Sequence, residues 1–202
     1  MKAIIVVADT SPSDIQYRIA DRFSFEGGIS RLNLNTALKF HSDDVFYILS
    51  GKLNNSVRRV QELIECILLE YREEDFCLFY IGHGQPEGWA LSGILNQEVL
   101  SYEDLNLVLA LHSGSLIFVN CCCYAGSAEK SLQARSGEFF LLAAMPSFVS
   151  GSANNFIKSI FKDWSIGKHF NPESVSTDDS HYGPVIFGNS DLEKLVFPKK
   201  RR

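Results

Sequence analysis

The sequence has no apolar run near the ~20 residues that a membrane-spanning helix requires. It also has no excess of basic residues, and a net charge of −5 argues against a nucleic-acid partner held through its phosphates. Asp9 ends the apolar start of the chain, and no small-residue cleavage site follows. We therefore interpret residues 3–8 as a strand rather than a signal peptide, and we expect a cytoplasmic protein without a membrane partner.

The sequence also lacks the common metal and cofactor motifs. None of its five cysteines is in the Cys-x-x-Cys spacing of a zinc site, and the glycines around His83 lack the dinucleotide-binding spacing. Neighbouring residues of a strand point to opposite faces, so the consecutive Cys121, Cys122 and Cys123 cannot share one metal ion. We predict no metal and no cofactor. An odd, clustered set of cysteines indicates a reducing compartment and a reactive thiol.

The composition is that of a globular protein. The chain has 202 residues, of which 46% are hydrophobic and 21% charged, and a chain of this size buries enough surface to fold without a disulfide or a metal. We predict one domain over residues 1–190 and a tail over 191–202. The basic end of the tail, residues 199–202, is interpreted as a solvated terminus rather than a nuclear-targeting or nucleic-acid contact.

Short β-branched apolar runs alternate with helical patterns, which predicts an α/β fold with a mostly parallel sheet. Cys77 within a strand and Cys66 on a helix are expected in the core. A long polar loop is predicted over residues 163–183. The predicted strands span residues 3–8, 44–49, 76–81, 116–120, 138–144 and 185–187, and the predicted helices span 14–25, 55–71, a segment starting at Ser101, and 154–164.

Two of these strands end in reactive groups. The strand at 76–81 runs into Gly82-His83-Gly84, and the strand at 116–120 runs into Cys121-Cys122-Cys123, some forty residues later. The carboxyl ends of neighbouring parallel strands meet at one edge of a sheet, where ligands bind. An imidazole near a thiol can take its proton or hold the thiolate as an ion pair. The glycines let the backbone approach a substrate and leave the Gly84 amide available for an oxyanion.

These residues resemble the motifs of the caspase-fold cysteine peptidases, which include caspases, metacaspases, legumains, gingipains, separases and CHAT proteases. Tyr80-Ile81-Gly82-His83-Gly84 is similar to their histidine motif, and Cys123-Tyr124-Ala125-Gly126 is similar to the Cys-x-x-Gly form of their nucleophile motif. The segment between the motifs looks like the hairpin and helix that CHAT proteases place there. The resemblance spans about residues 1–190. It implies a three-layer α/β/α fold with about six strands and an antiparallel last strand.

The resemblance also implies the chemistry. Cys123 would attack the scissile carbonyl of a protein or peptide, since Gly126 stands at the third position after it, whereas Gly126 comes too late after Cys121 or Cys122. His83 would act as general base and then as general acid. The Gly84 and Cys123 amides would stabilise the oxyanion.

In the resembled family the pocket for the residue before the cut is built from three places. They correspond here to Asp9, to Cys121, and to the segment after the fifth strand, with Met145, Ser147 and Phe148. Cys121 stands where metacaspases often have an acidic residue, and their calcium-binding acidic run is absent. We therefore expect a neutral or hydrophobic residue before the cut, while a basic one would implicate Asp9.

Two other readings stay open: a catalytically silent caspase-like module for protein interaction, and a non-peptidase α/β hydrolase or transferase with a cysteine nucleophile. Small bacterial caspase-like peptidases often act beside an activator in defence or cell-death systems, which implies a protein activator here. The connection over residues 127–137 is short for a caspase-type cleaved linker, so we expect an uncut active chain, with the 163–183 loop as the movable element.

Overall fold

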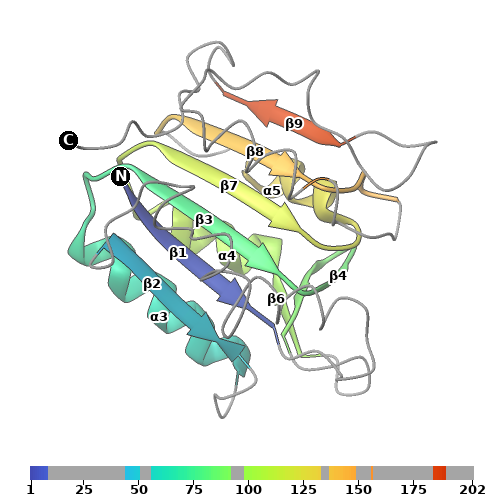
Figure 1. The fold of residues 1–202 in the computed structure, drawn as a ribbon, viewed down its shortest axis with the longest axis horizontal. Coiled ribbons are helices and arrows are strands. Elements are labelled where there is room, and N and C mark those ends of the chain that lie inside the picture. The colour runs from blue at the N-terminus through green and yellow to red at the C-terminus, as the bar shows by residue number, and fades with distance from the viewer. Residues whose placement is uncertain are drawn as a thin grey trace.

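The computed structural model describes residues 1–8, 44–50, 56–91, 98–132, 137–148, 156 and 184–189. Its main sheet has six strands in the order β2-β1-β3-β7-β8-β9 (Figure 1). All neighbours pair in parallel except β8 and β9, which are antiparallel. The strands are β1 (Lys2–Val7), β2 (Val45–Leu49), β3 (Phe76–Ile81), β7 (Leu116–Cys121), β8 (Phe139–Ala143) and β9 (Val185–Gly188).

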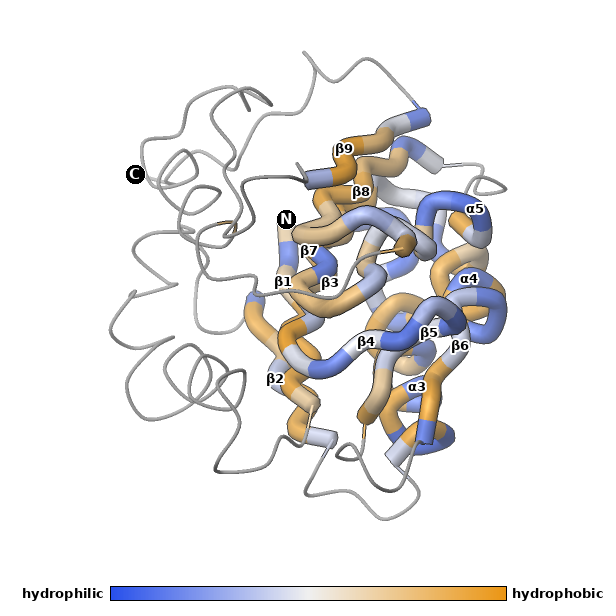
Figure 2. Tube along the Cα trace, turned by 90° about the vertical axis from the view of Figure 1, so that its right-hand side faces the viewer, coloured by the Kyte–Doolittle hydropathy of each residue, from blue (hydrophilic) through white to orange (hydrophobic). Residues whose placement is uncertain are grey.

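This arrangement confirms the predicted α/β fold class, the mostly parallel sheet and the antiparallel last strand. Every residue of β1, β3, β7 and β8 is buried, as expected for parallel strands that are covered on both faces. The described helices α3 (Ser56–Glu70), α4 (Tyr102–Leu109) and α5 (Ala128–Leu132) lie on one face of this sheet (Figure 2). The predicted helices at 14–25 and 154–164, the loop at 163–183 and the tail at 191–202 lie outside the described residues.

Helix α3 buries one stripe of residues four positions apart: Ser56, Val60, Ile64 and Leu68. Cys66 is two residues after Ile64, which on a helix is nearly the opposite side, and it is exposed. The prediction that Cys66 belongs to the core is therefore wrong, whereas Cys77 is buried as predicted. None of the described helices combines the length and the apolar character that crossing a membrane would need.

Helix α4 starts where the sequence predicts. Ser101 is its N-cap, and its Oγ accepts a hydrogen bond from the Asp104 backbone N at 3.0 Å. Glu103 and Asp104 are in the first turn, where the helix dipole favours negative charge.

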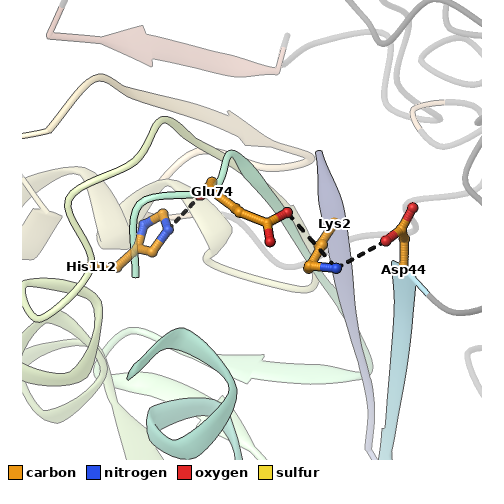
Figure 3. A network of polar contacts seen from close by, with 4 residues as sticks. All are labelled: Lys2, Asp44, Glu74 and His112. Atoms are coloured by element: carbon orange, nitrogen blue, oxygen red, sulfur yellow. Dashed lines mark hydrogen bonds and ion pairs between the residues drawn. The ribbon is translucent and has the colours of Figure 1, made fainter. Parts of the chain in front are cut away.

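Charged groups tie the strands together at the edge where β1 and β3 begin (Figure 3). Lys2 Nζ lies 2.9 Å from Asp44 Oδ1 and 3.8 Å from Glu74 Oε2, and 4.3 Å from the centre of the Tyr71 ring. His112 Nε2 lies 2.7 Å from the Glu74 carbonyl oxygen. The hydrogen bond to Asp44 raises the pKa of Lys2, so this stabilisation is complete below the ordinary lysine pKa and is lost only as pH rises through the raised value.

We predict that Asp44→Asn lowers the free energy of unfolding by about 1–2 kcal/mol, measured by urea denaturation at neutral pH. The reason is that the Lys2 side chain is only 11% exposed and would keep Glu74 alone as a charged partner. The matched control is Glu62→Gln, which breaks exposed ion pairs to Arg58 and Arg59 on α3 and should leave the urea midpoint unchanged. Equal effects of the two substitutions would contradict this account.

Candidate active site

The pairing of β3 with β7 brings the two predicted motifs together. The strands are parallel neighbours, and Ile81 pairs with Cys121. His83 and Cys123 each follow this pair by two residues, so both segments leave the sheet at the same level of its carboxyl edge (Figure 1). The edge is the one at which open α/β sheets bind ligands.

The two segments are in direct backbone contact. A Cβ built on Gly84 would lie 2.1 Å from the carbonyl oxygen of Cys123 and 2.7 Å from Cys122 Sγ, so a side chain at this position does not fit. A Cβ on Gly82 would lie 2.4 Å from the Ala8 Cβ. Both glycines of the histidine motif are therefore needed for packing, a role that the sequence analysis did not assign to them. The predicted oxyanion role of the Gly84 amide stays a prediction.

His83 begins a second, smaller sheet rather than a loop. This sheet contains β4 (His83–Gln85), β5 (Gly88–Ala90) and β6 (Val99–Ser101), all antiparallel, and it lies beside the carboxyl ends of the main strands (Figure 2). The Tyr80 hydroxyl lies 2.7 Å from the His83 carbonyl oxygen and 3.1 Å from that of Ala90. The Tyr80 ring stacks on Trp89 with centroids 4.2 Å apart. Tyr80 thus fixes the position of the His83 backbone by a hydrogen bond to its carbonyl oxygen.

Cys123 lies on a tight turn between β7 and a helical segment. Tyr124, the next residue, has φ 55° and ψ 21°, the left-handed conformation that is uncommon for a residue with a side chain. The 3₁₀ turn Ala125–Ser127 follows, and the Gly126 N donates to the Met145 carbonyl oxygen at 2.8 Å. Such strained residues persist where the surroundings hold them, and they cluster at functional sites.

Burial separates the three consecutive cysteines. Cys121 is 4% exposed and Cys122 is 0% exposed, and burial raises the pKa of both thiols well above the usual range. Cys123 is partly exposed. Cys121 and Cys122 are therefore core residues. Of the three cysteines Cys123 alone is not buried, which supports the motif alignment that selects it.

Asn120 is a site residue that the sequence analysis missed. It is fully buried at the end of β7, where its Oδ1 accepts from Trp89 Nε1 at 3.0 Å and its Nδ2 donates to the Ala125 carbonyl oxygen at 3.0 Å. It therefore links the β4–β5 hairpin to the turn that follows Cys123. A polar residue that ends an otherwise apolar strand just before a reactive motif is the signal that could have identified it.

The residues predicted to line the specificity pocket fall into three groups. Cys121 and Met145 are buried, and Met145, at 0% exposure, offers no accessible side-chain surface. Ser147 is exposed and accepts a hydrogen bond at its carbonyl oxygen from Ser127 Oγ at 3.3 Å, and Phe148 is 68% exposed. Asp9 lies outside the described residues. The segment after β8 therefore adjoins the Cys123 turn through the Met145 and Ser147 carbonyl oxygens, and its role in a specificity pocket stays a prediction.

Within the described residues, no group of three or more His, Cys, Asp and Glu side chains is arranged to hold a metal ion. The polar groups around the candidate site are instead hydroxyl, amide, indole and thiol groups.

No protein-family model matches the sequence, and no curated protein matches it either. Among solved structures, the fold is similar to the crystal structure of Raptor from Chaetomium thermophilum, with a TM-score of 0.51 and 11% sequence identity. The likeness covers 81% of this chain and 17% of the Raptor chain. At this identity the likeness concerns the fold alone.

We predict that iodoacetamide modifies Cys123 and Cys66 in the native protein and spares Cys77, Cys121 and Cys122, whose thiols are buried. Mass spectrometry of tryptic peptides measures the modification at each cysteine, and the same reaction in urea should modify all five. Modification of Cys122 before Cys123 in the native protein would show that the nucleophile is misassigned.

Proposed function

We propose that this chain is a cysteine endopeptidase that cleaves protein or peptide substrates with Cys123 and His83. The observation that carries the proposal is the backbone contact of Gly84 with Cys123, in which a Cβ on Gly84 would lie 2.1 Å from the Cys123 carbonyl oxygen. This contact joins the histidine segment to Cys123, the one residue of the cysteine triplet that is partly exposed. The two segments leave adjacent strand ends, and an imidazole beside a thiol at such a place is the arrangement that nucleophilic acyl transfer needs.

In this mechanism the Cys123 sulfur attacks the scissile carbonyl carbon, and His83 takes the thiol proton. The carbonyl oxygen then carries negative charge, which the Gly84 and Cys123 amides stabilise. Collapse of the tetrahedral intermediate breaks the C–N bond, and His83 returns the proton to the leaving amine. Water, activated by His83, hydrolyses the resulting thioester and restores the free thiol.

The resemblance to caspase-fold peptidases extends the proposal to a cytoplasmic enzyme that works without a cofactor, under a protein activator, in a regulated pathway of the defence or cell-death type. A silent interaction module and a non-peptidase hydrolase with the same nucleophile are the alternatives that the following experiments separate.

We expect Cys123→Ala and His83→Ala each to abolish cleavage of a peptide library while leaving the circular dichroism spectrum unchanged, because both side chains lie at the edge of the sheet. Cys66→Ala, which removes an exposed thiol on α3, is the matched control and should retain full activity. Activity that survives Cys123→Ala and is lost in Cys122→Ala would shift the nucleophile by one residue. If the wild-type chain cleaves no peptide, a Cys123 that is no more reactive than Cys66 would indicate the silent module, and a Cys123 that is more reactive would indicate a non-peptidase hydrolase or transferase.

The same library tests the proposed preference for a neutral or hydrophobic residue before the cut. Phe148 is 68% exposed and follows Ser147, whose carbonyl oxygen accepts a hydrogen bond from Ser127. Cys121 occupies the position where the resembled metacaspases often carry an acid. We expect cleavage after neutral or hydrophobic residues. A profile dominated by Arg or Lys would contradict this and assign the selectivity to Asp9.

We expect the active enzyme to be an uncut chain. The connection over residues 127–137 contains α5, whose Ala128 and Leu132 are buried, so cleavage there would release a packed helix next to the Cys123 turn. Intact mass spectrometry of the active enzyme provides the measurement. If activity develops only after a cut within residues 127–137, the chain is instead a caspase-type zymogen.

A further inference from the structure

A closed ring of hydrogen bonds includes Cys122, the residue before the candidate nucleophile. Asn120 Nδ2 donates to the Tyr102 hydroxyl at 3.0 Å, and Cys122 Sγ donates to Asn120 Oδ1 at 3.3 Å. The Tyr102 hydroxyl oxygen lies 3.8 Å from Cys122 Sγ, within reach of a hydrogen bond to sulfur. Because the single thiol hydrogen of Cys122 is donated to Asn120, the Tyr102 hydroxyl is the donor to the sulfur, and within the ring each of the three groups donates once and accepts once.

The orientation of the Asn120 amide is determined by its other partners. Trp89 Nε1 can only donate, so it faces Oδ1, and the Ala125 carbonyl can only accept, so it faces Nδ2. The amide thus makes four hydrogen bonds, which reach β5, α4 and both sides of the Cys123 turn. All these side chains are buried, where a polar group that loses its partner has no water to replace it.

Cys122 connects this ring to the histidine segment. Its sulfur would lie 2.7 Å from a Cβ on Gly84, so the thiol packs against the Gly84 backbone on one side while it is hydrogen-bonded to Asn120 on the other. Cys122 also precedes Cys123 directly. Any shift of its side chain therefore moves both halves of the candidate site.

We propose that the ring of Asn120, Tyr102 and Cys122 is the device that positions the Cys123 turn against the His83–Gly84 segment. Cys122 is then a positioning residue that acts through the hydrogen bonds of its thiol, and not a core residue of suitable size alone. The effect on catalysis rests on the proposed function, whereas the effect on the turn does not.

The test compares Cys122→Ala, Cys122→Ser and Asn120→Leu. Alanine removes the donor and the acceptor, whereas serine keeps both in a side chain that is no larger than cysteine. The matched control is His112→Gln, a buried polar residue at the opposite edge of the sheet that lies 2.7 Å from a backbone carbonyl oxygen. Amide hydrogen exchange of Gly126 and Ser127 reports the turn, since these amides bond to the Met145 and Tyr124 carbonyls, and steady-state peptide cleavage reports the site.

We expect Cys122→Ala and Asn120→Leu to accelerate exchange at Gly126 and Ser127 at least tenfold relative to β1, and to lower kcat about 100-fold with KM nearly unchanged. Cys122→Ser should restore both readouts, and His112→Gln should leave both at the wild-type value.

Two results would overturn the proposal. One is equal exchange rates and equal kcat in Cys122→Ala and Cys122→Ser, which would mean that the hydrogen bonds of the Cys122 thiol do not position the turn. The other is unchanged exchange at Gly126 and Ser127 in Asn120→Leu. If the wild-type chain cleaves no peptide, the proposed endopeptidase function fails, and the exchange data alone decide whether the ring holds the turn.

Discussion

The parallel pairing of β3 with β7 is the constraint on which the candidate site depends. With Ile81 opposite Cys121, the chain leaves both strands at the same level, and the His83 and Cys123 segments meet without any further adjustment. A slip of one residue would move every side chain of a strand to the other face of the sheet. The buried polar groups of both strands therefore secure the site indirectly, because a slipped register would separate Tyr80 and Asn120 from their hydrogen-bond partners.

The His83 segment approaches its neighbours closely because Gly82 and Gly84 have no side chains. Gly84 rests on the Cys122–Cys123 backbone, and Gly82 rests against Ala8. Close backbone contact leaves little freedom for either segment, and the left-handed Tyr124 adds a local strain that the same packing sustains. The absence of side chains at Gly82 and Gly84 thus brings these segments together, whatever the Gly84 amide also does for a substrate.

Much of this architecture could be predicted from the sequence, because unbroken apolar runs such as Phe76–Ile81 identify buried parallel strands and motif spacing identifies their order. The exposure of Cys66 could not be predicted. Helix α3 has apolar residues on more than one side, and the sequence alone does not determine which of them are buried. The role of Asn120 was missed for another reason. Its partners Trp89 and Tyr102 come from segments far along the chain, and only the folded structure brings them to one amide.

The two edges of the sheet use different interactions. At the edge near Lys2 the contacts are ionic, with carboxylates on either side of an ammonium group. Under the candidate site the described contacts join neutral groups, and burial raises the pKa of Tyr80, Tyr102 and Cys122, so all three stay protonated through the physiological range. A scaffold of groups that do not titrate keeps the same hydrogen bonds when a nearby thiol or imidazole changes its charge. Such a scaffold suits a site whose proposed chemistry moves a proton between Cys123 and His83, because the support does not have to rearrange when the proton moves.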